Sequence, residues 1–299
     1  MQQYLTMSYK EEFKYFKETY SDRIQEMFAA VSKLYADYWH DLFHFALFEN
    51  EEESWETAFD RTHERYMGLV DVKNASNILV LACGRGGFSN IIAQNTQGNV
   101  LGVDLSKSQL SHTKKYKRPN LSFRQLDIMK TGDLDMQFDA AVFLDAACYL
   151  PDKNKALSEI AKVLKPGAKL LIVDWCKEEG LTKIQEELVL YPFMKHWAIP
   201  SLETKKSYSR YFKKNGFKIH EITDLNDKAK RNWEFGYESA LKGVKKLSVK
   251  DTPALLWTGL KLGPKGVEIL KGQFPAAIYI KVGFDVGFLR YTLFLVEKT

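Results

Sequence analysis

Three glycines and one carboxylate are the residues of this chain best suited to hold a nucleotide-like ligand. Gly84, Gly86 and Gly87 directly follow the apolar run Ile78–Leu81, and Asp104 ends the next apolar run. Glycine permits positive φ and lets the backbone approach a ligand closely. A carboxylate at the end of the second strand can accept hydrogen bonds from both hydroxyls of a ribose. The pattern therefore predicts a ribose-containing ligand at the ends of two neighbouring strands.

Two ribose-containing ligands fit this arrangement, NAD and S-adenosylmethionine. The NAD fingerprint requires a third glycine three residues after the second, and Ser89 stands there. S-adenosylmethionine has no pyrophosphate to cradle, so its loop tolerates Ser89 and the adjacent pair Gly86 and Gly87. The pattern favours S-adenosylmethionine, and a dehydrogenase is the alternative.

The stretch Ile78-Leu79-Val80-Leu81-Ala82-Cys83-Gly84-Arg85-Gly86 resembles motif I of class I S-adenosylmethionine-dependent methyltransferases, hydrophobic-L-D/E-x-G-C-G-x-G. Val80 stands where that family often has a carboxylate, and Ala82 replaces the first glycine. In that family an acidic residue at the place of Asp127 meets the adenine amino group, and the next apolar residue packs on the ring. The cofactor residues implied by the resemblance are Ala82, Cys83, Gly84, Gly86, Asp104, Leu105, Gln109, Asp127 and Ile128.

A narrower resemblance to sterol methyltransferases runs, with gaps, from about residue 28 to residue 224. Those enzymes have a segment rich in tyrosine and tryptophan that ends in S-F-H-F. Here Tyr35, Trp39 and Phe43-His44-Phe45 stand at the matching offsets, with Leu42 in place of the serine. Their R-H-E-H-Y motif corresponds to Arg61-Thr62-His63-Glu64-Arg65-Tyr66. Terpene and prenyl diphosphate C-methyltransferases share much of this layout. The acceptor-pocket residues that the resemblance implies are Trp39, His44, His63 and Glu64.

Candidate catalytic residues follow the apolar run Phe138–Leu144. The sterol enzymes show E-A-T-C-H-A-P there, so Asp145 stands for their glutamate and Tyr149 for their histidine. Methylation of a double bond leaves a carbocation, which aromatic faces stabilise and which a carboxylate can stabilise or deprotonate. The resemblance thus implies C-methylation of an isoprenoid, with Asp145, Tyr149 and Tyr35 as catalytic candidates. A strand-end or helix-cap role for Asp145 is the alternative.

The elements that must position these residues alternate between strands and helices, which is typical of a parallel α/β sheet. We expect a Rossmann-like, doubly wound, mostly parallel sheet of seven strands, whose last strand is antiparallel by resemblance to the family. The expected organisation is an N-terminal helical lid over residues 1–70, a cofactor-binding core over 71–224, an inserted cap over 225–289 and a closing strand over 290–299.

Composition narrows the class of protein further. The 299 residues are 45% apolar and 27% charged with a net charge of +5, which is typical of a globular protein, and no long basic block indicates nucleic-acid binding. Cys83, Cys148 and Cys176 form no C-x-x-C pair, so we expect neither a metal site nor a disulfide. We find no run of eighteen apolar residues, so the sequence predicts no transmembrane helix.

We therefore expect a cytoplasmic protein that acts on a small apolar acceptor and can form a homo-oligomer. Two alternatives remain open: N- or O-methylation of another small apolar metabolite, and S-adenosylmethionine binding without catalysis.

Overall fold

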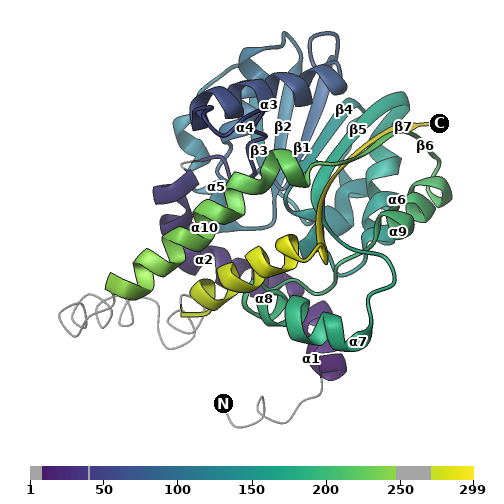
Figure 1. Ribbon diagram of the computed structural model, residues 1–299. Helices are drawn as coiled ribbons and strands as arrows, with labels where there is room; N and C mark the ends of the chain where they lie inside the picture. Colours follow the sequence, from purple (N-terminus) through teal and green to yellow (C-terminus); the bar gives the residue numbers. More distant parts are fainter. Residues whose placement is uncertain (1–8, 40, 247–270) are drawn as a thin grey trace.

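The computed structural model describes residues 9–39, 41–246 and 271–299, without the side chains of residues 9–10, 32–39 and 243–246. Within them, seven strands form one sheet in the order β3-β2-β1-β4-β5-β7-β6 (Figure 1). Their bounds are β1 (Asn77–Leu81), β2 (Asn99–Asp104), β3 (Leu121–Gln125), β4 (Phe138–Leu144), β5 (Leu164–Lys177), β6 (Phe217–Asp224) and β7 (Leu289–Lys298). The strands β1 to β5 pair in parallel, and β7 lies antiparallel between β5 and β6. The predicted doubly wound fold and its antiparallel closing strand are confirmed.

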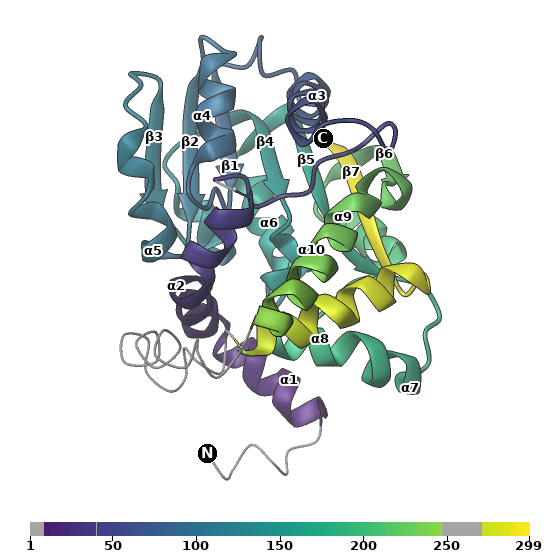
Figure 2. The same cartoon turned by 60° about the vertical axis from the view of Figure 1, so that its left-hand side comes forward.

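Helices cover both faces of this sheet (Figure 2). The α-helices are α1 (Tyr9–Glu18), α2 (Tyr20–Trp39), α3 (Trp55–Leu69), α4 (Gly87–Gln94), α5 (Lys107–Leu110), α6 (Lys153–Val163), α7 (Lys183–Gln185), α8 (Tyr191–His196), α9 (Lys205–Lys214) and α10 (Asn226–Lys246), and residues 271–285 are also helical. The short turns are η2 (Thr113–Lys115), η3 (Ile128–Asp133), η4 (Ala147–Tyr149) and η5 (Glu186–Leu190).

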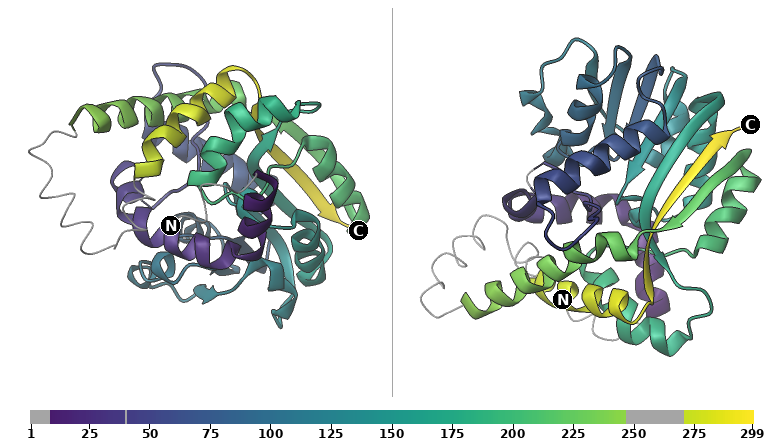
Figure 3. Two further views of the ribbon diagram at one scale, coloured as in Figure 1. Left: turned by 90° about the horizontal axis from the view of Figure 1, so that it is seen from below. Right: turned by 45° about the horizontal axis from the view of Figure 1, so that its top comes forward.

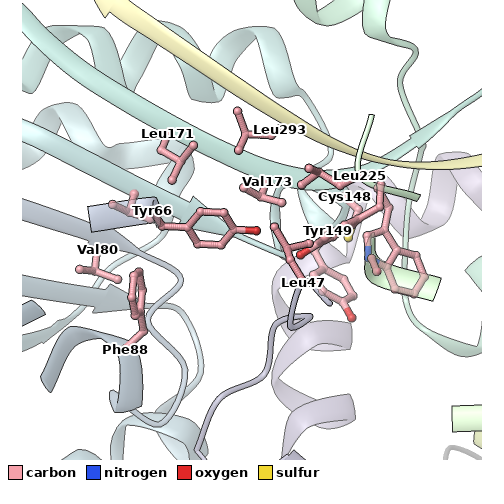
Figure 4. Close-up of a cluster of buried hydrophobic side chains, with 14 of the residues drawn as sticks. Leu47, Tyr66, Val80, Phe88, Cys148, Tyr149, Leu171, Val173, Leu225 and Leu293 are labelled. Atoms are coloured by element: carbon pink, nitrogen blue, oxygen red, sulfur yellow. The ribbon is translucent and has the colours of Figure 1, made fainter. Parts of the chain in front are cut away.

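Alternate residues of β1 supply two hydrophobic cores, one on each face of the sheet. Ile78 and Val80 join the core that α3 and α4 cover, whereas Leu79 and Leu81 join the core that α6 and α9 cover. Figure 4 shows part of the first core, in which Tyr66 and other buried side chains lie along the strands. Because both faces are covered, the parallel strands carry continuous apolar runs instead of alternating ones.

Side-chain caps set two boundaries of these elements. β3 ends at Gln125, before Asp127 and Ile128, because the Asp127 side chain accepts a hydrogen bond from the main-chain N–H of Met129 and caps η3. The helix before β6 begins at Lys205, where the Thr204 side chain caps its first turn.

The helices outside the minimal fold gather at the carboxyl ends of the parallel strands. Seen from that end, α1, α2, α8, α10 and the helix over 271–285 lie around one another (Figure 3, left). Ligands of doubly wound sheets bind beyond these strand ends. The fold therefore directs attention to the space between the sheet edge and these helices.

Candidate cofactor and acceptor site

The glycine turn between β1 and α4 combines positive φ with close packing. Gly84 and Gly86 have φ values of +54° and +85°, and Ala82, which is not a glycine, has +48°. A Cβ on Gly86 would lie 2.8 Å from the Phe123 ring, and a Cβ on Gly87 would lie 2.7 Å from a main-chain oxygen of the segment after α2. Gly86 and Gly87 are therefore needed for packing, because a side chain at either position would clash. Gly84 and Ala82 are the turn residues left to border a ligand.

A cleft of about 650 Å³ lies beside this turn, bounded by α2 and by the ends of β1, β2 and β4. Seven of the nine predicted cofactor residues line it: Ala82, Gly84, Asp104, Leu105, Gln109, Asp127 and Ile128. The other two do not. Gly86 packs on Phe123, and Cys83 faces a neighbouring hollow. We call this space the cofactor cleft.

Asp104 stands at the end of β2 with its carboxylate held by two main-chain donors. Its Oδ2 accepts a hydrogen bond from the N–H of Gly84 at 2.8 Å, and its Oδ1 accepts one from Ser106 at 2.8 Å. An ionised carboxylate has about four acceptor sites, so lone pairs remain for ribose hydroxyls. Burial raises the pKa of Asp104 to about 6, against the opposing effect of the two hydrogen bonds.

Cofactor affinity is expected to fall as the pH drops below about 6, because protonation removes the charge of Asp104 and replaces an acceptor with a donor. The dissociation constant then rises by up to about tenfold per pH unit, since only the ionised form binds the ribose well. Calorimetric titration of S-adenosylmethionine between about pH 5 and pH 8 measures this. An affinity that stays constant over this range in the wild type would contradict the role of Asp104.

The wall opposite the sheet comes from α2, whose Tyr20, Ile24 and Phe28 line the cleft. The Tyr20 hydroxyl donates a hydrogen bond to Oδ2 of Asp127, 107 residues away in sequence. Tyr20 was not among the predicted cofactor residues. The signal was present in the i, i+4, i+8 spacing of these three residues, which marks one face of a helix, but periodicity cannot say that the face covers a ligand.

Replacing Tyr20 with phenylalanine is expected to speed cofactor dissociation about tenfold, because a hydrogen bond to a carboxylate that helps to close the cleft is lost. Stopped-flow displacement measures the dissociation rate. Tyr211→Phe is the matched control, since that hydroxyl donates to Glu203 on the far side of the sheet. Equal dissociation rates in wild type and Tyr20→Phe would show that the contact does not close the cleft.

A second attachment holds the segment after α2 against the glycine turn. Asp41 accepts hydrogen bonds from Nε of Arg85 at 2.8 Å, from the Tyr116 hydroxyl at 2.9 Å and from Lys115. Since Arg85 lies between Gly84 and Gly86, Asp41 attaches the N-terminal segment directly to the glycine turn. The main chain of this segment is also the one that excludes a side chain at Gly87.

Asp145 follows β4 in a left-handed conformation, with φ of +49°. Its Oδ2 accepts hydrogen bonds from the main-chain N–H of Phe45 at 2.9 Å and from the Tyr291 hydroxyl at 2.9 Å. Its Oδ1 accepts one from the indole N–H of Trp175 at 3.1 Å. Burial, and after it the charge of Asp174, raise the pKa of Asp145 well above its usual value. Phe45 of the N-terminal segment, Trp175 of β5 and Tyr291 of β7 thus all donate to this carboxylate, which also lines the cofactor cleft.

Beyond Asp145 lies an aromatic chamber of about 590 Å³. Its lining is Phe28, Phe43, His44, Phe45, Asp145, Cys148, Tyr149, Trp175 and Trp197. It shares Phe28, Phe43, Asp145 and Tyr149 with the cofactor cleft. An outer chamber of about 690 Å³, between α10 and the helix over 271–285, shares Phe45, Trp175 and Trp197 with the aromatic chamber. Three spaces therefore follow one another from the cofactor cleft outward.

The remaining predicted residues fall in different places. Tyr149 lines both the cofactor cleft and the aromatic chamber. His44 lines the aromatic chamber, and His63 lies behind it, with 2.9 Å between their Nε2 atoms. Burial lowers the pKa of His44 well below its usual value and that of His63 to about 4, so both rings are neutral at pH 7.

Glu64 is exposed on α3 and borders neither the cofactor cleft nor either chamber. Tyr35 and Trp39 belong to α2, but their side chains lie outside the described residues. The candidates that come together are therefore Asp145, Tyr149 and His44.

Comparison with known proteins supports what the cleft suggests. Residues 79–172 match a family described as methyltransferase domain. Cycloartenol-C-24-methyltransferase 1 of Oryza sativa subsp. japonica is 30% identical over 166 residues, which are 54% of this chain and 48% of the rice protein. The O-methyltransferase resE of Aspergillus sclerotiorum is 25% identical over 234 residues, which are 75% of this chain and 84% of that protein. Residues 79–172 therefore match a methyltransferase domain, and the chain resembles the class I S-adenosylmethionine-dependent methyltransferases.

Solved structures agree on the fold of this chain. A geranyl diphosphate C-methyltransferase from Streptomyces coelicolor A3(2) superposes with a TM-score of 0.62 at 17% identity, and the match covers 94% of this chain and 98% of that one. The chain spans about half the length of the cycloartenol methyltransferases that it matches. Among the described residues, none of the helices has both the length and the apolar character that crossing a membrane requires.

Proposed function

We propose that this methyltransferase moves the methyl group of S-adenosylmethionine to a carbon–carbon double bond of an isoprenoid. The observation that carries the proposal is that an aromatic chamber borders the cofactor cleft and that Asp145 lines both spaces. A double bond is a weak nucleophile and becomes a cation when it is methylated. It therefore needs an apolar space next to the methyl donor and groups that stabilise positive charge, and the chamber offers both.

The chemistry of the cleft lining fits S-adenosylmethionine. Asp104 has acceptor sites for the ribose hydroxyls, Asp127 can accept a hydrogen bond from the adenine amino group, and Ile128 can pack on the ring. Gly84 has no side chain and Ala82 has only a methyl group, so the main chain at both residues is accessible to the rest of the cofactor. The bound cofactor would supply an electrophilic methyl group on a sulfonium, which is already a good leaving group.

The protein's own residues then have two tasks. The first is to hold the acceptor carbon about 3–3.5 Å from the methyl group and to exclude water, for which Phe45, Trp175 and Trp197 form an apolar wall. The second is to manage charge. The ring faces stabilise the cation on the acceptor, and Asp145 stabilises it or accepts the proton that it loses.

A prenyl diphosphate or a terpene is the leading acceptor class, and a sterol follows it. Two similar proteins are named for C-methylation of such molecules, one for cycloartenol and one for geranyl diphosphate. The three adjoining spaces suit an extended apolar molecule whose reacting double bond lies in the aromatic chamber and whose remainder extends toward α10. Transfer to an oxygen is the second candidate, because the chain aligns over most of the length of an O-methyltransferase.

Calorimetry followed by a turnover assay separates an enzyme from a non-catalytic binder of S-adenosylmethionine. We expect one cofactor to bind per chain and labelled methyl groups to appear in an apolar extract when a prenyl alcohol or prenyl diphosphate is added. Tight binding of the cofactor with no transfer to any acceptor of this class would contradict the proposed reaction and leave the binding role.

A further inference from the structure

The outer chamber is lined by one face of each of two helices that lie side by side, α10 and the helix over 271–285 (Figure 2). On α10 the lining includes Asn232, Gly236 and Ala240, which follow one another at i, i+4 and i+8 and therefore share one face. Ala277 lines the chamber from the other helix. Small residues thus border this space from both helices.

Two contacts fix the end of the chamber that adjoins the aromatic chamber. The side-chain oxygen of Asn232 accepts a hydrogen bond from the Ala46 N–H at 3.0 Å, and its amide donates to the Ala46 carbonyl at 2.8 Å. Trp233 stacks on Phe284 with 4.0 Å between the ring centroids. Ala46 directly follows Phe45, which lines both chambers. The position of α10 is therefore set where the two chambers adjoin.

Gly236 lies inside α10, where glycine is among the least favourable residues for a helix. Packing does not require a glycine there, because a Cβ at this position would have no described heavy atom within 4 Å. Its φ does not require one either, since Gly236 is not in the left-handed region. Gly236 lines the outer chamber. The space that a side chain would occupy is therefore left to the chamber.

One buried donor in the wall of the outer chamber has no acceptor. Trp233 is 5% exposed, and within the described part of the chain its indole N–H donates to no other group. A buried donor without a partner is costly, and the indole nitrogen can only donate. An oxygen atom of a bound molecule would supply the missing acceptor.

The described residues that line the outer chamber are all uncharged. In the two spaces before it, the charged lining residues are Asp104, Asp127 and Asp145, which would repel an anion. A diphosphate in the outer chamber would lose its hydration without meeting a cation, which is strongly unfavourable. A hydroxyl group carries no such penalty and can accept the single hydrogen bond that Trp233 offers.

We propose that the outer chamber binds the far end of an uncharged isoprenoid alcohol. Gly236 determines how long a molecule fits, and the Trp233 indole donates to the hydroxyl oxygen. The reacting double bond lies in the aromatic chamber, so the double bond and the hydroxyl are at opposite ends of the acceptor. The inference rests on the proposed function, and it narrows the isoprenoid class to members without a diphosphate.

Calorimetric titration of saturated isoprenoid alcohols of increasing length tests the role of Gly236 without turnover, because these molecules have no double bond to methylate. S-Adenosylhomocysteine is present throughout. Wild-type affinity is expected to rise with length, since each added isoprene unit buries apolar surface. Gly236→Leu is expected to bind short alcohols as the wild type does and long ones about tenfold more weakly or worse, because its side chain fills the chamber.

Gly68→Leu is the matched control, since Gly68 is an exposed glycine of α3 that also has no described neighbour within 4 Å of a Cβ. It is expected to keep the wild-type preference for length. Gly236→Ala serves if Gly236→Leu does not fold, and it is expected to change the preference in the same direction by a smaller factor. An identical preference in the wild type and in the folded Gly236 variant would overturn the proposal.

Trp233→Phe tests the oxygen contact, because it keeps an aromatic ring and removes the N–H. The affinity for a long alcohol is expected to fall about tenfold, while the affinity for the hydrocarbon with the same carbon skeleton stays nearly unchanged. Equal changes for the alcohol and the hydrocarbon would show that Trp233 only packs, and would overturn the contact. Tighter binding of a prenyl diphosphate than of the matching alcohol by the wild type would overturn the uncharged class.

Turnover separates this inference from the proposed function. If the saturated alcohols bind as expected and no unsaturated isoprenoid is methylated, the proposed reaction is wrong and the binding site stands. If unsaturated isoprenoids are methylated and Gly236→Leu keeps the wild-type preference for length, the reaction stands and the role of the outer chamber is wrong.

Discussion

Replacing Asp145 with asparagine is expected to lower the turnover rate about 10²- to 10⁴-fold, with cofactor affinity nearly unchanged. The substitution keeps the size of the side chain and removes the charge at the junction of the cofactor cleft and the aromatic chamber. Positive charge appears on the acceptor only during the reaction. Loss of the Asp145 charge therefore affects the rate before it affects binding. The expected change corresponds to about 3–5 kcal/mol of transition-state stabilisation.

Two controls make this result interpretable. Asp135→Asn changes an exposed aspartate outside the site, and thermal melting reports whether Asp145→Asn keeps the fold that the contacts with Phe45, Trp175 and Tyr291 support. A folded Asp145→Asn protein with a near-normal rate would show that Asp145 only caps the strand end. The search for the proton acceptor would then move to Tyr149, which lines the same two spaces.

Asp104→Ala is expected to weaken S-adenosylmethionine binding by about 1.5–3 kcal/mol, or about 10- to 150-fold. The substitution removes the acceptor for the ribose, and it also leaves the N–H groups of Gly84 and Ser106 without their partner. Asp104→Asn separates these effects, because its side-chain oxygen can still accept one of the two main-chain hydrogen bonds. Isothermal titration calorimetry measures both variants. Unchanged affinity in Asp104→Ala would contradict the cofactor assignment, and binding of NAD in its place would restore the dehydrogenase interpretation.

The cofactor side of the site was predictable because its signals are local. The turn at Gly84 follows directly from the run that forms β1, and Asp104 and Asp127 follow the next two strands in order. Parallel strands bring their carboxyl ends to one edge of the sheet, so sequence order alone puts these residues together. The same logic placed Asp145 correctly at the end of β4, where it lines the cleft.

The contacts that enclose the site could not be predicted, because they join distant segments. Tyr291 donates a hydrogen bond to Asp145, from which it is separated by 146 positions in the sequence. Asp41 accepts hydrogen bonds from Lys115 and Tyr116, which are more than seventy positions away. Glu64 shows that a match to a sequence motif does not by itself place a side chain in the site. Its neighbour His63 in the motif is buried, but consecutive residues on a helix point in different directions, so Glu64 is exposed.

Mass spectrometry of products made with methyl-labelled S-adenosylmethionine tests the central claim most directly. The acceptor panel contains prenyl diphosphates, the corresponding prenyl alcohols, sterols, phenols and amines, and fragmentation locates the label. We expect a labelled methyl group on a former double-bond carbon of an isoprenoid, formed by the wild type and about 10²- to 10⁴-fold more slowly by Asp145→Asn. A label found only on oxygen or nitrogen, at a rate that Asp145→Asn does not change, would contradict it.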